Sequence, residues 1–322
     1  MNTNLSDVVA AFGFASSKSI TEHKSGSGFS GATLWRVETD RGSFCLRRWP
    51  AGFRDQEKLL STSRVLALAA RNGCEFIPVP IIANDSVPFV TADDCLWEMT
   101  PWMAGQANFN EAPSAVKLSS AMTALAKFHQ VLEPVQSSLA VPLSVSQRVD
   151  QLRTLPNVLV NAARNSSAAP SDRIRELAIA ASFKLPRRQT LLLQQAADLA
   201  QFSVRVQPVI RDIWHEHVLF TGDRVTGIVD FGAMRVDTVA CDLARLLGSI
   251  RMGGQPPWQL GLQAYQQSRP LQKEELGLIP WLHETGVVLG LLNWIEWILV
   301  HQRQFPNWGA VAGRMEQLLA QL

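Results

Sequence analysis

The sequence predicts an α+β protein, with strands gathered in the first third of the chain and helices in the remainder. The β-rich runs TLWRVET (33–39) and SFCLRRW (43–49) are joined by the turn DRG, which indicates a hairpin. After about residue 100, apolar residues recur mainly at helical spacing. Because strands and helices are segregated rather than alternating, an α+β arrangement is expected instead of an alternating α/β one.

The remaining elements of the first 100 residues are short. Residues 5–13 are expected to form a helix with Ser6 as its N-cap, and residues 54–72 a second helix that Gly73 ends. Two prolines make FIPVPII a connector or an edge strand. The stretch PFVTADDCLWEM reads as two strands around an Asp-Asp turn.

Helices dominate the rest of the chain. Periodic apolar residues predict a helix over 113–132 and mostly helical structure over 145–203, with a loop at 165–172. Two short strands are expected around TGDR, within 218–230. The apolar stretch 286–300 is too short and too polar to span a bilayer, so it is expected to be a buried helix.

The change from strand-rich to helix-rich sequence predicts two lobes, a β-rich N-lobe over residues 1–100 and a mostly helical C-lobe over 101–322.

Composition excludes several classes of protein. A net charge of +2, without runs of basic residues, argues against nucleic acid as a partner. The N-terminus lacks the pattern of a signal peptide, so neither secretion nor a membrane partner is expected. Four scattered cysteines suit a reducing cytoplasm rather than a disulfide framework or a zinc knuckle. Composition leaves the oligomeric state open.

The stretch VIRDIWHEHVLFTGDRVTGIVDFG (209–232) carries the chemistry. Asp212 is followed five residues later by His217 and 18 residues later by Asp230, which begins Asp-Phe-Gly after an apolar run. Transfer of a phosphoryl group needs one carboxylate to orient the acceptor hydroxyl and take its proton, and a second to hold a metal ion. The spacing is similar to that of the kinase pattern H-R-D-x-x-x-x-N followed by D-F-G, and this likeness predicts Asp212 as the catalytic base and Asp230, with His217, as metal ligands.

Upstream residues could bind a nucleotide. The loop that contains Gly26, Gly28 and Ser30 could cover its phosphates through backbone N–H groups. Arg47, on a predicted strand, is placed to pair with the α- and β-phosphates, and Glu57, early in the next helix, is expected to hold that arginine.

A hinge is expected at 98–103, where the strand-rich part of the sequence gives way to the helix-rich part. Thr100 and Trp102 are its expected nucleotide contacts. Pro101 has no N–H, so a backbone donor to an adenine edge would come from Trp102 or Met103.

Together these residues, with LAKFH at 125–129 and Asp242-Leu243-Ala244, resemble the aminoglycoside phosphotransferase family, which includes choline-kinase-like and homoserine-kinase-like enzymes. The likeness covers roughly residues 20–250. It implies a two-lobed protein-kinase-like fold, ATP or another nucleoside triphosphate, Mg²⁺ with Mn²⁺ as the alternative ion, and a small-molecule hydroxyl acceptor. In such a fold the N-lobe (1–100) is expected to bind the nucleotide, and the C-lobe (101–322) to carry the catalytic loop, the metal loop and the acceptor-binding helices. Asp242, at the start of a predicted helix that runs through Leu246, is expected to cap or brace the catalytic loop rather than to contact the substrate.

The chain departs from the family pattern at several positions. Ile210 and Arg211 replace His-Gly before the expected base, and His217 stands where the family has a metal-binding Asn. Imidazole suits Mn²⁺ or Zn²⁺ better than Mg²⁺. Three readings of His217 therefore stay open: the metal preference has shifted, Mg²⁺ is held mainly by Asp230, or catalysis is weakened or absent. Two other functions also stay open: a non-catalytic, kinase-like nucleotide- or ligand-binding module, and a zinc hydrolase built on His215 and His217.

Overall fold

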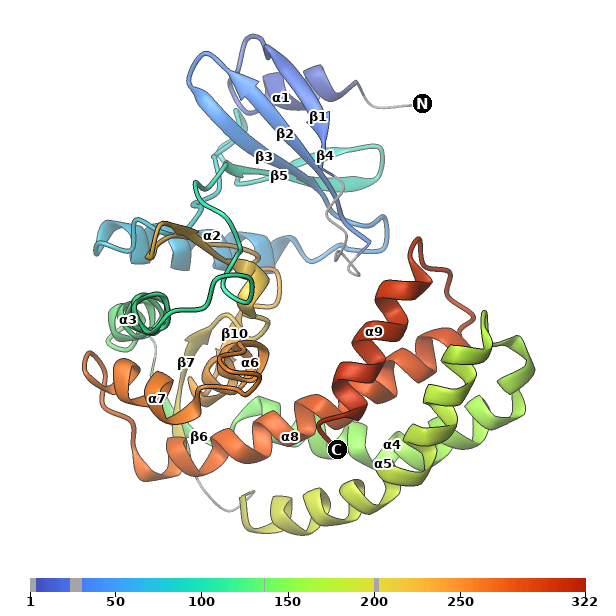
Figure 1. The fold of residues 1–322 in the computed structure, drawn as a ribbon. Coiled ribbons are helices and arrows are strands. Elements are labelled where there is room, and N and C mark those ends of the chain that lie inside the picture. Colours follow the sequence, from blue (N-terminus) through green and yellow to red (C-terminus); the bar gives the residue numbers. More distant parts are fainter. Residues whose placement is uncertain (1–3, 24–30, 136, 200–202) are drawn as a thin grey trace. The chain divides into compact units, whose positions relative to one another are not determined.

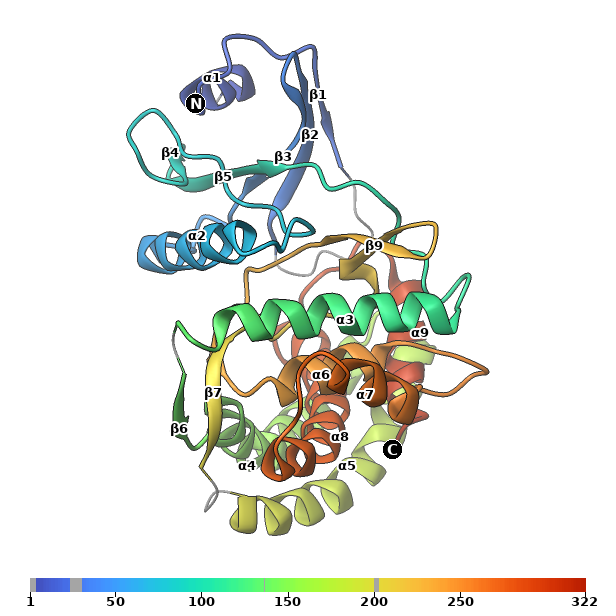
Figure 2. The same ribbon diagram turned by 90° about the vertical axis from the view of Figure 1, so that its left-hand side faces the viewer.

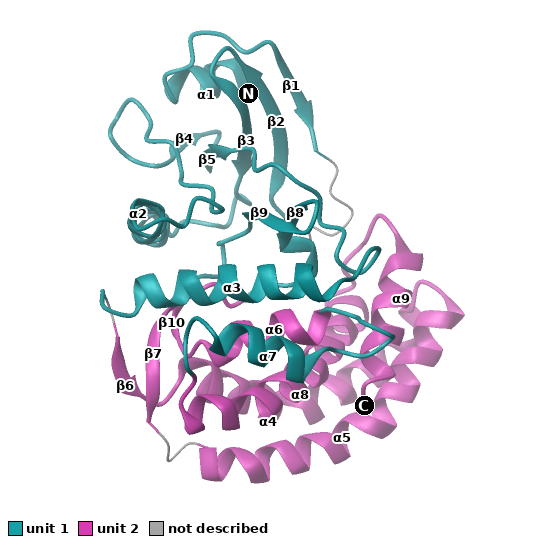
Figure 3. Ribbon diagram, turned by 60° about the vertical axis from the view of Figure 1, so that its left-hand side comes forward, with its two compact units in different colours: residues 1–135, 212–234, 250–270 teal, residues 136–211, 235–249, 271–322 magenta. Residues whose placement is uncertain are grey.

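The computed structural model describes residues 4–23, 31–135, 137–199 and 203–322 (Figure 1). Gly26, Gly28 and Ser30 of the expected phosphate loop lie outside this range. The chain divides into two compact units, coloured in Figure 3: unit 1 is 1–135, 212–234 and 250–270, and unit 2 is 136–211, 235–249 and 271–322. The two lobes expected from the sequence follow chain order and stay a prediction.

Unit 1 contains an antiparallel sheet of five strands in the order β1-β2-β3-β5-β4. The strands are β1 (Ser19–Glu22), β2 (Thr33–Thr39), β3 (Gly42–Arg48), β4 (Val90–Ala92) and β5 (Cys95–Pro101). The β2–β3 hairpin has the predicted turn. Asp93 and Asp94 join β4 to β5 with φ of 46° and 57°, a left-handed conformation that aspartate tolerates better than most residues.

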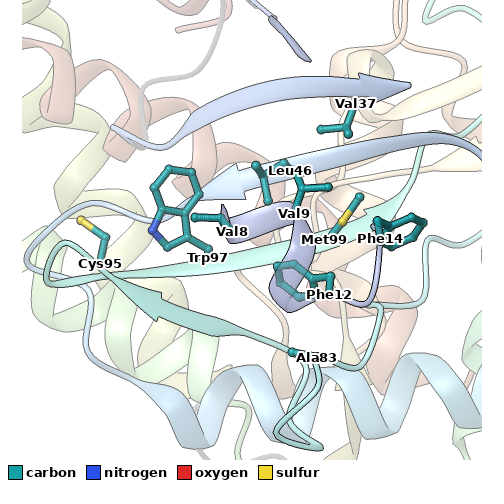
Figure 4. Packing of buried hydrophobic residues seen from close by; sticks show 10 residues of the cluster. All are labelled: Val8, Val9, Phe12, Phe14, Val37, Leu46, Ala83, Cys95, Trp97 and Met99. Atoms are coloured by element: carbon teal, nitrogen blue, oxygen red, sulfur yellow. The ribbon is translucent and has the colours of Figure 1, made fainter. Parts of the chain in front are cut away.

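One face of this sheet packs against α1 (Leu5–Ala11), and the buried side chains between them are drawn in Figure 4. Val37, Leu46 and Met99 are fully buried in this cluster. The expected N-cap at Ser6 is wrong by two residues, because the Asn4 side chain accepts a hydrogen bond from the Ser6 backbone N–H at 3.1 Å. Helix α2 (Gln56–Arg71) begins at the side-chain cap Asp55.

Unit 1 also holds a helix pair and a second hairpin. Helix α3 (Ala115–Leu132) packs against α7 (Trp258–Gln266) and against the hairpin of β8 (Val218–Thr221) and β9 (Arg224–Ile228) (Figure 2). Gly105 lies against this hairpin with φ of 105°, and a Cβ there would come within 2.8 Å of the Phe220 carbonyl oxygen. Glycine is therefore required at the approach of this segment to the hairpin.

Unit 2 is mainly helical and has a small antiparallel sheet in the order β10-β7-β6. Its strands are β6 (Ser138–Ala140), β7 (Val204–Val209) and β10 (Arg235–Asp237). Its helices are α4 (Leu143–Arg164), α5 (Asp172–Leu199), α6 (Ala240–Ser249), α8 (Lys273–Ile295) and α9 (Trp308–Leu319), with a π-helical turn at Glu296–Val300.

The predicted buried helix at 286–300 corresponds to the end of α8 and this π-helical turn. Val288, Leu291 and Ile295 are at most 1% exposed. Within the described residues, no helix combines the length and the apolar character needed to cross a bilayer. The α+β class predicted from the sequence is confirmed.

Candidate active site

Strand pairing places Arg47 opposite a buried acid. Arg47 of β3 is the register partner of Glu98 of β5, and residues directly opposite each other in an antiparallel pair share one face of the sheet. Glu98 is 9% exposed. Burial raises the pKa of the Glu98 carboxyl, although the Arg47 charge opposes this shift. The sheet thus carries a buried acid beside the cation that was predicted to bind phosphates.

Arg47 makes its ion pair with Asp230. Its Nη1 lies 3.1 Å from Asp230 Oδ1, across 183 residues of sequence. The predicted partner Glu57 is exposed, and it makes no ion pair with Arg47. The expectation that Glu57 holds Arg47 is corrected, because the strand register and the Asp230 loop supply the nearby carboxylates instead.

Asp230 follows β9 in a conformation that few residues adopt. Its φ is 64°, and its Oδ1 also faces the Gly232 backbone N–H at 3.4 Å. Burial would raise the pKa of the Asp230 carboxyl, but the charge and the hydrogen bond of Arg47 hold the pKa below its ordinary value. Asp230 is therefore an ionised carboxylate whose Oδ1 is paired.

Gly232 is fixed by the space around this carboxylate. A Cβ at this position would lie 2.9 Å from the Trp49 ring and 3.5 Å from Arg47 Nη1. Arg47 in turn lies over the Trp49 ring, with its guanidinium carbon 5.1 Å from the ring centroid. A larger residue in place of the glycine of Asp-Phe-Gly would therefore require the Trp49 ring to shift, whereas its distance to Arg47 would be an ordinary contact.

His217 joins the expected base to Asp230. Its Nδ1 lies 2.8 Å from the carbonyl oxygen of Asp212, and its Nε2 lies 3.9 Å from Asp230 Oδ2. The Trp214 indole N–H donates to the same Nε2 at 2.7 Å. The backbone continues this link, because the His217 carbonyl accepts from Val229 N–H at 2.9 Å. The loop that precedes β8 and the loop that follows β9, together called the loop pair, thus bring together Asp212, His217 and Asp230 within unit 1.

The expected hinge residues lie at the end of strand β5 and directly after it. Thr100 pairs with Cys45 across the sheet, and the Trp102 N–H donates to the Ser43 carbonyl at 3.0 Å. That N–H is therefore committed within the sheet, which leaves Met103 as the predicted donor to an adenine edge. Gly227 lies against this segment, because a Cβ there would meet the Met103 Cβ at 2.8 Å.

In unit 2, Asp242 holds the residues that precede the expected base. It is fully buried, and its two carboxylate oxygens accept from the backbone N–H groups of Ile210 at 2.8 Å and Arg211 at 2.6 Å. Arg211 has a φ of 67°, and its side chain donates to Gln147 at 2.9 Å. The bracing role expected of Asp242 is therefore seen directly.

The donor atoms of this site suit a hard cation. Asp230 offers a carboxylate oxygen, Oδ2, that takes no part in the bond to Arg47, and Mg²⁺ is commonly held by one or two carboxylates with phosphate and water oxygens. Within the described ranges, no three His, Cys, Asp or Glu side chains gather as a metal-binding group. A zinc hydrolase on His215 and His217 would need further ligands that these ranges do not supply.

Sequence reasoning named Glu98 only as part of the hinge at 98–103, and it missed Trp49 and Trp214. A signal for Glu98 was available, because a lone acid stands within the apolar strand CLWEM. Trp49 and Trp214 gave no such signal, since nothing in the sequence indicates which rings meet Arg47 or His217.

Solved structures share this fold. The spectinomycin phosphotransferase APH(9)-Ia in complex with ADP and spectinomycin matches with a TM-score of 0.70 and 12% identity, over 98% of this chain and 95% of that one. A microcompartment-associated aminopropanol kinase matches with a TM-score of 0.67 and 14% identity, over 98% and 94%. At such identities the likeness shows the fold, and it confirms the predicted protein-kinase-like arrangement.

Two curated relatives are similar over a part of the chain. The homoserine kinase of Parvibaculum lavamentivorans is 30% identical over 95 residues, and that of Methylobacterium nodulans is 31% identical over 98 residues. Each alignment covers 28% of this chain and 30% of the homoserine kinase. The chain therefore matches less than a third of the length of these relatives.

A model described as the phosphotransferase enzyme family matches residues 22–278, which include Arg47, Asp212 and Asp230. This range is most of the 322 residues and covers the segment on which the sequence resemblance rests. The chain therefore belongs to the phosphotransferase enzyme family.

Proposed function

We propose that this protein is an ATP-dependent phosphotransferase that moves the γ-phosphoryl group to a hydroxyl of a small molecule. The observation that carries the proposal is the meeting of Arg47 and Asp230 at 3.1 Å, in the unit that also contains the Asp212 loop. A cation for phosphates, a carboxylate for a metal ion and a second carboxylate for the acceptor are the parts that this reaction needs.

Asp212 is the proposed base. It is half-buried, and its backbone carbonyl is held by His217, so the loop that presents the carboxylate is anchored beside it. In this role the carboxylate orients the acceptor hydroxyl and accepts its proton as the oxygen bonds to the γ-phosphorus of ATP, whose bond to the bridging oxygen breaks so that ADP leaves.

Arg47 is the proposed phosphate clamp. Its guanidinium stays protonated and presents a fork that matches phosphate oxygens. Asp230 is the proposed metal ligand, and Mg²⁺ bound there would neutralise charge on the phosphate oxygens. We also propose two segments that contact ATP. One contains Gly26, Gly28 and Ser30, and the other contains Thr100, Trp102 and Met103.

The proposed acceptor is a small hydroxyl compound. The names of the similar proteins (spectinomycin phosphotransferase, aminopropanol kinase and homoserine kinase) support this class without selecting one compound. A net charge of +2 supports neither nucleic acid nor membrane as a partner. A cytoplasmic location is proposed because ATP is the donor and all four cysteines are free thiols.

The test compares wild type with Asp212→Asn over a panel of hydroxylated metabolites, amino alcohols and aminoglycosides, with ATP and Mg²⁺. Loss of the general base should lower kcat by about 10²-fold or more while ATP still stabilises the protein. Asp223→Asn is the matched control, because this exposed aspartate lies at the β8–β9 turn, where its carboxylate accepts a hydrogen bond from the Ser114 hydroxyl.

Equal kcat in wild type and Asp212→Asn would remove Asp212 as the base. A protein that ATP with Mg²⁺ or Mn²⁺ never stabilises against heat would instead be the non-catalytic module considered from the sequence.

A further inference from the structure

His217 stands where the family places a metal-binding Asn, and Trp214 determines what its ring can do. The two rings are edge-to-face, with centroids 5.5 Å apart and planes at 79°. The indole Nε1 lies 2.7 Å from His217 Nε2. A 3₁₀ turn brings them together, since the His217 backbone N–H donates to the Trp214 carbonyl at 2.8 Å.

This contact fixes the protonation of the imidazole. An indole nitrogen is only ever a donor, so Nε2 of His217 must present its lone pair to the indole N–H. The Asp212 carbonyl is only ever an acceptor, so Nδ1, 2.8 Å away, must carry the proton. In this arrangement the Nδ1 proton is donated to the Asp212 carbonyl, and the Nε2 lone pair accepts from the Trp214 indole N–H.

A neutral imidazole has one nitrogen lone pair, and metal ions bind histidine through it. In His217 that lone pair is directed at the Trp214 N–H rather than at the Asp230 carboxylate. The 3.9 Å from Nε2 to Asp230 Oδ2 exceeds hydrogen-bond length, so the shorter contact of this lone pair is the one to the indole.

We propose that Trp214 keeps His217 out of the coordination of any metal ion held by Asp230, and that His217 is a positioning residue for the backbone of Asp212. The inference rests on the proposed function, because it concerns the metal site of that reaction. With the imidazole occupied, this loop pair presents oxygen rather than nitrogen to a cation. We call the hydrogen bond from Trp214 to His217 Nε2 the lock. The lock thus favours Mg²⁺ over Zn²⁺, because Zn²⁺ is the ion that a free imidazole would bind better.

The first experiment examines the imidazole itself, in the full-length wild type without metal or nucleotide. The protein is labelled with ¹⁵N-histidine, and the His217 signals are assigned by their loss in His217→Ala. We expect Nδ1 to resonate as a protonated nitrogen and Nε2 as an unprotonated acceptor. A proton on Nε2 would overturn the proposal.

The second experiment removes the indole N–H and keeps an aromatic ring. Trp214→Phe should bind Zn²⁺ alone about tenfold more tightly than wild type by calorimetry, a change within the range that outer partners of metal ligands control. Co²⁺ alone should gain the visible absorption of a nitrogen ligand in this variant. Mg²⁺ binding should change much less, because Mg²⁺ prefers oxygen.

Two further proteins control this experiment. Trp308→Phe makes the same substitution at the start of α9, where Trp308 has an edge-to-face contact with Phe305, and it should bind Zn²⁺ as wild type does. The double variant Trp214→Phe/His217→Ala should lose the gain. A gain that persists without His217, or no gain in a folded Trp214→Phe, would refute the lock.

The outcomes separate this inference from the proposed function. If the proposed function fails, the failure appears in the Asp212→Asn comparison and in the ATP-dependent thermal shift. Neither measurement depends on the hydrogen bonding of the His217 imidazole. Failure of the lock shows in the ¹⁵N signals and in the Zn²⁺ affinities, which require no ATP.

Discussion

Asp242 is the residue whose replacement should best show how the backbone of Ile210 and Arg211, just before the expected base, is held. The proposed change is Asp242→Asn, which keeps the size of the side chain and exchanges one acceptor oxygen for an NH₂ donor. Both carboxylate oxygens now accept backbone N–H groups, at 2.8 Å from Ile210 and 2.6 Å from Arg211, in a fully buried position.

The expected loss of stability can be estimated from these two bonds. A hydrogen bond to a charged group contributes about 1.5–3 kcal/mol. The amide keeps one acceptor, loses the other bond and turns a donor toward a buried N–H. The free energy of unfolding should therefore fall by about 3 kcal/mol. Asp150→Asn is the control, because Asp150 is 74% exposed and its pairing with Arg153 should contribute about 0.5 kcal/mol or less.

The measurement is urea unfolding followed by intrinsic fluorescence, paired with steady-state kinetics. Arg211 directly precedes Asp212 in the chain, so a loosened backbone should lower kcat at least about tenfold, with a smaller change in the KM for ATP. A variant as stable as Asp150→Asn would refute the energetic reasoning. A large loss of stability with unchanged kcat would refute the link to the base.

Further substitutions should have the following effects. His217→Asn should keep or raise Mg²⁺-supported activity, measured as initial rate against Mg²⁺ concentration, because the amide offers both a donor and an oxygen ligand; a collapse in rate would contradict this. Burial raises the pKa of the Cys45 and Cys74 thiols to about 11, so the folded protein holds these protons longer than the unfolded chain. The stability that comes from keeping these thiols protonated is thus complete below pH 9 and is lost as the pH rises toward 11. Iodoacetamide should therefore label both thiols slowly at pH 8 unless the protein is unfolded. Leu46→Ala, at a fully buried core position, should lower the free energy of unfolding by about 2–5 kcal/mol in a urea titration; a loss below 1 kcal/mol would mean that the sheet core repacks.

Local patterns were sufficient to predict much of the fold. The β2–β3 hairpin, α3 and the hairpin around TGDR follow from periodicity and turn residues that act within a few positions of each other. Strand β1 went unpredicted because its four residues, SITE, are too few to show alternation. The N-cap was misplaced because Asn4 and Ser6 both suit that position, and only the backbone conformation distinguishes them.

The site was predictable where the family motif fixes spacing, and unpredictable where strand register decides. Asp230 and Arg47 were both named, and the structure brings them together. The acid beside Arg47 is Glu98 rather than Glu57, because β3 pairs with β5, and sequence does not reveal this register. Trp214 was missed for a similar reason, since its bond to His217 depends on a three-residue turn.

The ion pair between Arg47 and Asp230 has a thermodynamic consequence for the order of binding. A divalent cation that reaches Asp230 alone must compete with a guanidinium 3.1 Å away, whereas a triphosphate gives that guanidinium a new anionic partner. The Arg47 guanidinium then exchanges the Asp230 carboxylate for the phosphates in one step, and the carboxylate becomes available to the metal ion. Metal and nucleotide should accordingly bind with positive cooperativity, each raising the affinity for the other by the same factor.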